Sequence, residues 1–228
     1  MQYFPISLDM NGRQCIVIGG GRVAARKIKS LLACGGKVTV ISPDLTPELE
    51  ELSLAGTLSW KKNSFQEGDL NGAFLVIAAT DDPDDQKKVH EEAEHHNIML
   101  NVADVPERCS FILPATVRRG DLTVSVSTAG KSPALAKKLR QALEKQFGHE
   151  YAVCLNIMGV LRPVVLGCNR SQKENEALFE RILDSDMLAW IREKNWERMS
   201  EHIREILQSE GIDPGCLDTI EECFPEGL

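Results

Sequence analysis

A short apolar segment that runs into three glycines restricts the fold of this chain more than any other feature. Gln14–Ile18 (QCIVI) leads directly into Gly19–Gly21, and a stretch with helical character follows. Gly19 permits a tight turn, Gly21 lets a phosphate approach the backbone, and the small Ala24 lets helix and strand pack closely. The free N–H groups at the start of such a helix favour an anion. The segment therefore predicts a strand–turn–helix unit that binds a dinucleotide.

The segments after this turn alternate between strand and helix patterns. The predicted strands are Lys37–Ile41, Leu58–Lys61, Phe74–Ala79 and Ile98–Val102. The predicted helices are Arg22–Cys34 and about Pro83–His96, the second with Pro in its first turn, where the missing N–H does no harm. This order predicts an α/β fold with a Rossmann-like, doubly wound parallel sheet, which we assign to residues 1–113 as an NAD-binding domain.

The pattern changes after residue 113. Phe111–Val117 and Leu122–Thr128 are rich in β-forming residues, and the four-residue connection between them contains glycine, which predicts an antiparallel hairpin. A helix is predicted at Pro133–Phe147, with Ser132 as its N-cap. From Glu150 onward apolar residues recur at helical spacing, which indicates a packed core rather than a cofactor site. We therefore expect a hairpin-and-helix region at 114–149 and an all-helical domain at 150–228.

Composition and charge argue against several classes of protein. A formal net charge of -8 is unfavourable for broad nucleic-acid binding. The first ten residues (MQYFPISLDM) lack the basic and apolar regions of a signal peptide, and no uninterrupted apolar stretch is long enough for a membrane span. Seven cysteines without a C-x-x-C pair predict neither a disulfide framework nor a structural zinc site. We expect a cytoplasmic protein with no nucleic-acid or membrane partner.

A dinucleotide site of this kind needs a carboxylate for the ribose about 20 residues beyond the glycine turn. Asp44 lies 20 residues after Ala24, so it either contacts the ribose or only caps a turn. No Arg follows it directly, which favours NAD over NADP. Thr80 follows the predicted fourth strand, where it either lines the nicotinamide side of the crevice or serves as an N-cap. The candidate cofactor-binding residues are Gly19, Gly21, Arg22, Val23, Pro43, Asp44 and Thr80.

Five motifs, in order and in spacing, resemble the precorrin-2 dehydrogenase and sirohydrochlorin ferrochelatase family, found alone or as the amino-terminal part of siroheme synthase. They are Tyr3–Ile6 (YFPI), Val17–Lys27 (VIGGGRVAARK), Ala78–Asp82 (AATDD), Asn101–Ala115 (NVADVPERCSFILPA) and Ser127–Arg140 (STAGKSPALAKKLR). The resemblance covers residues 1 to 150 closely and the helical tail only in general character. It implies NAD-dependent oxidation of precorrin-2 to sirohydrochlorin and, in some members, insertion of ferrous iron to give siroheme.

The resemblance also implies an assembly and a length. Two chains are expected to entwine as a homodimer, with 114–149 as the dimerisation region. A chain of this length is expected to lack the methyltransferase half of the fused synthase, so that another protein makes precorrin-2.

Asp104 is the candidate catalytic residue. It follows the strand Ile98–Val102, near the carboxyl ends of the strands, where an open α/β sheet binds ligands. In the family, the aspartate of this motif is implicated in both activities. One carboxylate facing the macrocycle suits both, because dehydrogenation releases a proton as hydride leaves and chelation releases the pyrrole N–H protons. The alternative is that Asp104 only caps a turn before Pro106.

A polycarboxylate such as precorrin-2 requires cations, and basic residues cluster around the predicted hairpin and the helix after it. Arginine suits bidentate carboxylate binding, although a solvated surface is the alternative for any single residue. The candidate substrate-binding residues are Arg118, Arg119, Thr128, Lys131 and Lys137. At Thr128 the family often has serine, so a serine-specific role does not carry over. Three histidines, His90, His95 and His96, lie on a predicted surface helix away from the cleft, and His149 and His202 are isolated, so we assign no metal ligand.

A function of another class stays open, namely an NAD-sensing or ligand-binding Rossmann regulatory protein. Asp104, the basic cluster and the segment GKSPALA favour the enzyme. A binding module would need neither a proton acceptor beside the nicotinamide nor cations for a polyacid.

Overall fold

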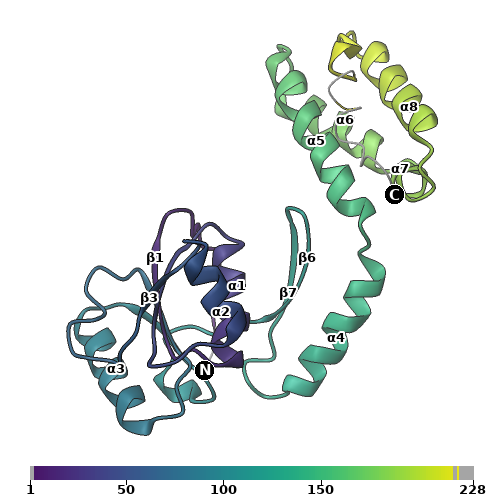
Figure 1. The fold of residues 1–228 in the computed structure, drawn as a ribbon. Coiled ribbons are helices and arrows are strands. Elements are labelled where there is room, and N and C mark those ends of the chain that lie inside the picture. Colours follow the sequence, from purple (N-terminus) through teal and green to yellow (C-terminus); the bar gives the residue numbers. More distant parts are fainter. Residues whose placement is uncertain (1–2, 218–219, 221–228) are drawn as a thin grey trace. The chain divides into compact units, whose positions relative to one another are not determined.

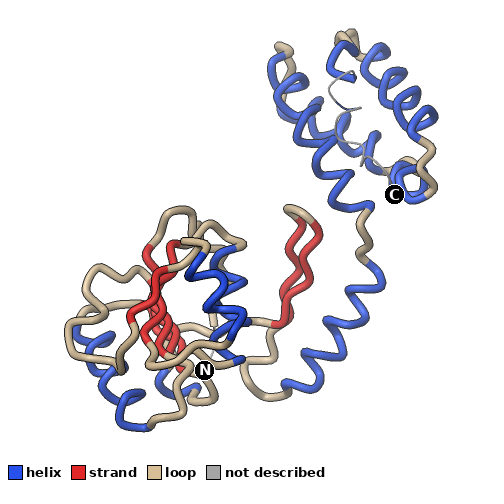
Figure 2. The backbone as a smooth tube through the Cα atoms, viewed as in Figure 1, coloured by secondary structure: helices blue, strands red, loops and turns tan. Residues whose placement is uncertain are grey.

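The structure is a computed structural model that describes residues 3–217 and 220. It divides into two compact units, each described by itself below. Unit 1 consists of Met1–Leu113 and Ala129–Lys131, and unit 2 consists of Pro114–Thr128 and Ser132–Leu228. Figures 1 and 2 show their helices and strands.

Unit 1 contains a parallel sheet of five strands in the order β3-β2-β1-β4-β5. The strands are β1 Gln14–Ile18, β2 Lys37–Ile41, β3 Ser59–Lys61, β4 Leu75–Ala78 and β5 Met99–Val102. All four residues of β4 are buried, as expected for a strand covered on both faces. The direction of strand order reverses between β1 and β4, and ligands of such sheets bind at this switch point. The predicted Rossmann-like sheet is confirmed.

Helices cover both faces of this sheet (Figure 1). α1 (Arg22–Leu32) and α2 (Pro47–Leu54) lie on one face, and α3 (Pro83–His95) lies on the other. Alternate strand residues explain the division, because Val17 packs with the α1 residues while Ile16 packs with the α3 residues.

Two helix predictions needed correction. α1 ends at Leu32 rather than Cys34, because the chain turns at Gly35, whose φ of +78° favours glycine. The sequence predicted no helix where α2 forms. Leu49 is the one fully buried residue among the eight of α2, so its apolar periodicity is weak.

Unit 2 begins with the antiparallel hairpin of β6 (Ala115–Arg119) and β7 (Leu122–Val126). The hairpin is confirmed, but its connection has two residues instead of four, because Gly120 at φ +56° closes the turn directly after Arg119. The predicted strand Phe111–Val117 starts only at Ala115, because Ser110 and Phe111 bond to β5 instead.

Most of the remaining described residues of unit 2 are helical. α4 (Pro133–Gln146) begins as predicted, with the Ser132 side chain accepting a hydrogen bond from the Leu135 N–H. The others are α5 Glu150–Gly167, α6 Gln172–Leu183, α7 Met187–Arg192 and α8 Trp196–Ser209. The apolar faces of α5, α6, α7 and α8 form one core around Ile157, Leu161 and Ile203. This confirms the predicted helical region.

α5 is long and apolar enough to cross a membrane by length and composition alone, with a mean hydropathy of 1.3. A core helix passes the same test. Ile157, Leu161 and Val165 of α5 are fully buried in the helical core, which accounts for the apolar composition without a membrane.

Candidate cofactor and active site

Gly19 occupies the sharpest point of the turn after β1. Its φ of +102° is in the region that L side chains rarely adopt, and a Cβ there would lie 2.5 Å from the carbonyl oxygen of Ala79, just past β4. Its N–H donates to the carbonyl of Ile41 at the end of β2 (2.9 Å). Gly19 therefore lets the ends of three strands approach one another, as the sequence predicted for a tight turn.

Gly20 was given no role by the sequence, and the structure shows that it has one. A Cβ at this position would lie 2.1 Å from the backbone oxygen of Asp44 and 2.7 Å from Cδ2 of Leu45. The Thr46 N–H also donates to the Gly20 carbonyl (3.0 Å). Gly20 thus holds the loop after β2 against the glycine turn. The middle position of this motif accepts many residues in general, so the sequence carried no signal for it.

Gly21 faces open space. A Cβ added here would meet no heavy atom of the described residues within 4 Å, although the residue precedes α1 directly as its N-cap. The first turn of α1 contains no acidic residue, and Arg22 and Val23 are exposed there. Free backbone N–H groups and the helix dipole make such a site suitable for a pyrophosphate. The geometry at Gly21 therefore fits the predicted cofactor.

The other predicted cofactor residues lie after neighbouring strands. Pro43 and Asp44 follow β2 and are exposed, and the Asp44 carbonyl accepts a hydrogen bond from the buried Ser42 hydroxyl (2.7 Å). Thr80 follows β4, and its hydroxyl accepts the N–H of Asp82 (3.2 Å). The N-cap of α3 is Asp82, not Thr80, since the Asp82 carboxylate accepts from the N–H groups of the first turn. All these residues lie at the carboxyl edge of the sheet.

Asp104 lies in a tight turn at the same edge. Its φ of +60° is unusual for a residue other than glycine, and its side chain is exposed. Among residues 3–217 and 220, no side chain or backbone N–H donates to its carboxylate. The short helix η1 (Pro106–Arg108) has Val105 as its N-cap, so Asp104 does not act as the turn cap considered above. Strained, exposed residues of this kind are frequent at functional sites.

The loop that carries Asp104 is tied down on both sides. The Cys109 thiol donates to the Val102 carbonyl and accepts the Val102 N–H, both at 3.2 Å. The Ser110 hydroxyl accepts the N–H of Leu100 (2.8 Å), and the Ser110 N–H donates to the Leu100 carbonyl (2.9 Å). Burial raises the pKa of the Cys109 thiol, which keeps it protonated as a donor. Through these contacts Cys109 and Ser110 hold the loop that follows Asp104 against β5.

Sequence reasoning missed Lys27 and Asn101. The Lys27 ammonium, on α1, donates to Oδ1 of Asn101 on β5 (3.0 Å), and Nδ2 of Asn101 donates to the Phe111 carbonyl (3.1 Å). Burial lowers the pKa of Lys27, and the neighbouring Arg26 lowers it further. The sequence did contain a signal for Asn101, because it is a polar residue inside an otherwise apolar strand.

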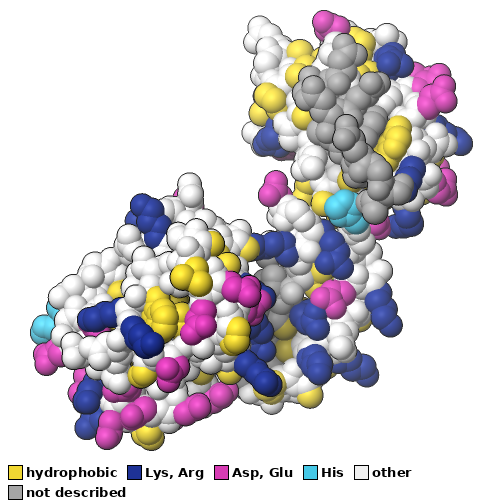
Figure 3. Space-filling model, in the orientation of Figure 1, with side chains coloured by type: hydrophobic (Ala, Val, Ile, Leu, Met, Phe, Trp, Pro, Cys, Tyr) yellow, Lys and Arg dark blue, Asp and Glu magenta, His cyan; other side chains and the backbone are white. Residues whose placement is uncertain are grey.

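The predicted substrate-binding residues are distributed over both units. Lys131 belongs to unit 1, and the other four belong to unit 2. Arg119 donates to the Glu144 carbonyl on α4 (3.1 Å), and the Thr128 hydroxyl donates to the Ser132 carbonyl (3.1 Å), so both have local partners. Lys137 is exposed on α4, where Figure 3 shows a concentration of Lys and Arg side chains.

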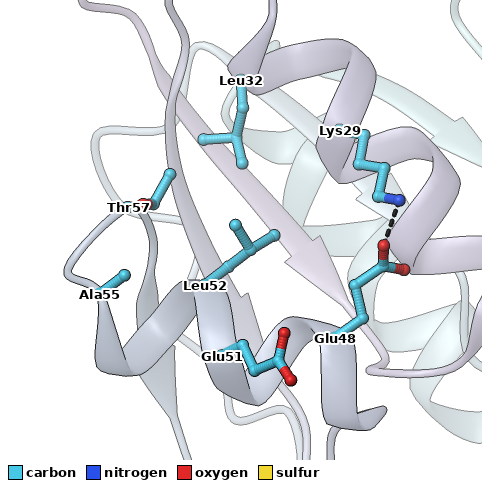
Figure 4. A pocket seen from close by; sticks show the side chains of 7 residues that line it. All are labelled: Lys29, Leu32, Glu48, Glu51, Leu52, Ala55 and Thr57. Atoms are coloured by element: carbon cyan, nitrogen blue, oxygen red, sulfur yellow. Dashed lines mark ion pairs between the residues drawn. The ribbon is translucent and has the colours of Figure 1, made fainter.

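A surface depression lies between α1 and α2 and is shown in Figure 4. Lys29 and Glu48 point toward each other across it and form an ion pair. Leu32 and Thr57, which also line it, lie at the end of α1 and two residues before β3. The depression thus extends toward the amino ends of the strands, away from the glycine turn. It does not contain the predicted cofactor residues.

Within the described part of the chain, no three His, Cys, Asp or Glu side chains lie close enough together to hold a metal ion. Asp81 and Asp82 are exposed at the start of α3, where Asp82 serves as its cap.

Comparisons with known proteins bear on this site. Residues 6–115 match a family described as putative NAD(P)-binding, and residues 119–146 match the central part of sirohaem biosynthesis proteins. Siroheme synthase 1 of Aeromonas salmonicida is 38% identical over 82% of this chain and 40% of its own length. Siroheme synthase of Thioalkalivibrio sulfidiphilus is 35% identical over 100% of this chain and 43% of its own length.

A solved structure agrees over almost the whole chain. SirC, a precorrin-2 dehydrogenase, superimposes with a TM-score of 0.76 at 27% identity, covering 90% of this chain and all of SirC. The chain is thus similar both to a precorrin-2 dehydrogenase and to siroheme synthases, and the predicted resemblance is confirmed. It spans less than half the length of the two siroheme synthases compared above. The NAD(P)-binding match over the glycine turn and the likeness to this dehydrogenase support an NAD-type cofactor for unit 1.

Proposed function

We propose that this protein is an NAD-dependent dehydrogenase that oxidises precorrin-2 to sirohydrochlorin. The observation that carries the proposal is the placement of Asp104. An exposed carboxylate, held at φ +60° and without a hydrogen-bond donor among the described residues, lies at the sheet edge where the glycine turn binds a dinucleotide. The SirC likeness supports precorrin-2 as the substrate.

The reaction removes two hydrogens from precorrin-2. One leaves as a hydride to the nicotinamide and the other as a proton, so precorrin-2 and NAD⁺ give sirohydrochlorin, NADH and H⁺. The Asp104 carboxylate accepts the proton and later releases it to water. A positioned base of this kind contributes roughly 10²- to 10⁴-fold to a rate.

The residues around the glycine turn have distinct tasks toward the cofactor. The N–H groups at Gly21, Arg22 and Val23 bind the pyrophosphate, and Asp44, held beside them through Gly20, accepts the ribose hydroxyls. A carboxylate at this place disfavours a 2′-phosphate, so NAD is preferred over NADP. Pro43 and Thr80 line the two ends of the crevice.

Precorrin-2 carries many carboxylates, and exposed basic residues are the candidates for binding them. Arg118 and Lys137 are exposed on the hairpin and on α4, and Lys131 is exposed in the loop between them. Arg119 and Thr128 hold the hairpin and the loop in place through the hydrogen bonds given above.

The same unit offers a surface for a second copy of the chain. One face of the hairpin carries Val117, Leu122, Val124 and Val126, and only Val117 is fully buried. On α4, Leu135 and Leu139 lie one turn apart and are 48% and 42% exposed. We therefore propose a homodimer through 114–149. Leu135→Glu with Leu139→Glu should reduce the mass in light scattering by half, whereas Lys138→Glu, on an exposed position of the same helix, should not.

Ferrous iron is proposed as a second substrate, to give siroheme, and the cytoplasm as the compartment. The described residues hold no cluster of metal-binding side chains, so iron would be held by the macrocycle and Asp104 during insertion. Adding ferrous iron to enzyme-generated sirohydrochlorin tests this, because an enzyme-dependent gain in siroheme absorbance over the spontaneous rate is expected.

The test of the main proposal is an anaerobic incubation of purified protein with precorrin-2 and NAD, following NADH and tetrapyrrole absorbance. Asp104→Asn should lower turnover at least 10²-fold while leaving NAD affinity intact. Glu107→Gln, at an exposed position of the same loop, is the matched control and should keep full activity. A folded, NAD-binding protein that makes no NADH from precorrin-2 would overturn the proposal.

A further inference from the structure

Lys27 has an environment that the proposed mechanism does not explain. It lies in the second turn of α1, half-buried, and its ammonium reaches across to Oδ1 of Asn101 at 3.0 Å. Asn101 is 7% exposed and lies on β5, three residues before Asp104. A lysine side chain is seldom drawn into the interior unless a partner compensates the loss of hydration. Here the partner is a neutral amide.

Asn101 connects Lys27 with the loop that carries Asp104. Its Oδ1 accepts from Lys27, and its Nδ2 donates to the Phe111 carbonyl at 3.1 Å, beyond the far end of that loop. Cys109, which binds both backbone groups of Val102, lies 3.7 Å from the same Nδ2. A movement of Lys27 would therefore be transmitted to both ends of the Asp104 loop.

The charged and titratable groups around Lys27 are few. Arg26 lies beside it on α1, Asp104 follows β5, and Cys109 follows η1. Burial and Arg26 lower the pKa of Lys27, while Cys109 and Asp104 oppose them. The Lys27 ammonium thus makes one hydrogen bond, to Asn101, and has a charge interaction with Asp104.

We propose, on the basis of the dehydrogenase function above, that Lys27 is a positioning residue for proton transfer. Through Asn101 it fixes the turn that holds the Asp104 carboxylate. Its positive charge also attracts the Asp104 carboxylate. Lys27 does not itself touch the reacting atoms.

A positive charge that acts on Asp104 leaves a signature in the pH dependence of turnover. The lowered pKa of Lys27 places an alkaline limb below the ordinary range of lysine, because deprotonated Lys27 no longer supports Asp104. In Lys27→Arg that alkaline limb should disappear, since the guanidinium stays charged.

The experiment compares Lys27→Met, Lys27→Arg and Lys27→Gln with Lys29→Met, an exposed lysine two residues along α1. Wild type and variants are assayed with precorrin-2 and NAD across pH, and NAD affinity is measured by calorimetry. Lys27→Met and Lys27→Gln should lose roughly 10- to 100-fold in kcat, because the turn that carries the base is displaced. NAD affinity should change by less than about twofold, and Lys27→Arg should recover most of the rate.

The outcomes separate this inference from the function on which it rests. If wild type makes no NADH, the dehydrogenase proposal fails. If wild type is active and Lys27→Met equals Lys29→Met, the function stands and the role of Lys27 is wrong. If Lys27→Gln and Lys27→Arg are equally slow and both keep the alkaline limb of the wild type, the contact is purely structural and the inference is overturned. Should Lys27→Met fail to fold, the profiles of the Arg and Gln variants decide.

Discussion

Replacing Gly20 and Gly21 separately by alanine distinguishes a glycine needed for folding from one needed for the cofactor. In Gly20→Ala the new methyl would lie 2.1 Å from the Asp44 carbonyl oxygen, which is backbone and cannot swing away. The loop after β2 must move, and overpacking of this kind costs about 1–3 kcal/mol. In Gly21→Ala the methyl meets no described atom within 4 Å, and the backbone there is extended (φ -83°).

The expected cost of Gly21→Ala is therefore small for folding and large for binding. Alanine is a poorer N-cap than glycine, which limits the loss to about 1 kcal/mol or less. The methyl would, however, occupy the space of the pyrophosphate and weaken one charge-assisted hydrogen bond. A bond of that type contributes about 1.5–3 kcal/mol, which corresponds to roughly 10- to 100-fold in the Kd for NAD.

Urea denaturation and calorimetric titration with NAD measure the two effects. Gly20→Ala should lower the free energy of unfolding of unit 1 more than Gly21→Ala does. Gly21→Ala should stay folded and bind NAD roughly 10- to 100-fold more weakly. Wild-type NAD affinity in Gly21→Ala would refute the assignment of the pyrophosphate to this turn. Equal stability of the two variants would refute the packing argument at Gly20.

Three further predictions follow from particular contacts. Asp44→Ala should weaken NAD binding but not NADP binding, so the difference between the two Kd values measured by calorimetry should become smaller. An unchanged ratio of the two Kd values would show that Asp44 does not contact the ribose. Leu161→Ala, at a fully buried position of α5, should destabilise the helical core by about 2–5 kcal/mol in urea without changing NAD affinity. Burial alone would raise the pKa of Glu150, but its hydrogen bond to Arg192 (2.7 Å) and backbone donors bring the pKa below the usual range of a glutamate. The stabilisation by this contact is thus present at neutral pH and is lost as the pH falls through the lowered pKa. Glu150→Gln should therefore flatten the acid dependence of unfolding measured by circular dichroism, and an unaltered dependence would contradict this.

Local signals in the sequence were sufficient for much of the architecture. The apolar run before Gly19 marked β1, the apolar composition of β4 marked a buried strand, and Ser132 with Pro133 marked the start of α4. Each of these depends on a few consecutive residues, whose backbone preferences and burial are written in their order. The family motifs likewise pointed to Asp104 and to the glycine turn.

Only the tertiary structure decided the contacts between distant segments. It revealed that Gly20 must lack a side chain because Asp44 approaches it, and that Lys27 and Asn101 meet although 74 residues separate them. It also showed that α2 forms with a single fully buried residue, Leu49, so its place depends on the sheet beneath it more than on its own periodicity. The physical reason is common to all three, because the folded backbone decides which distant segments pack together, and the residues next to each segment in the sequence do not specify its partner.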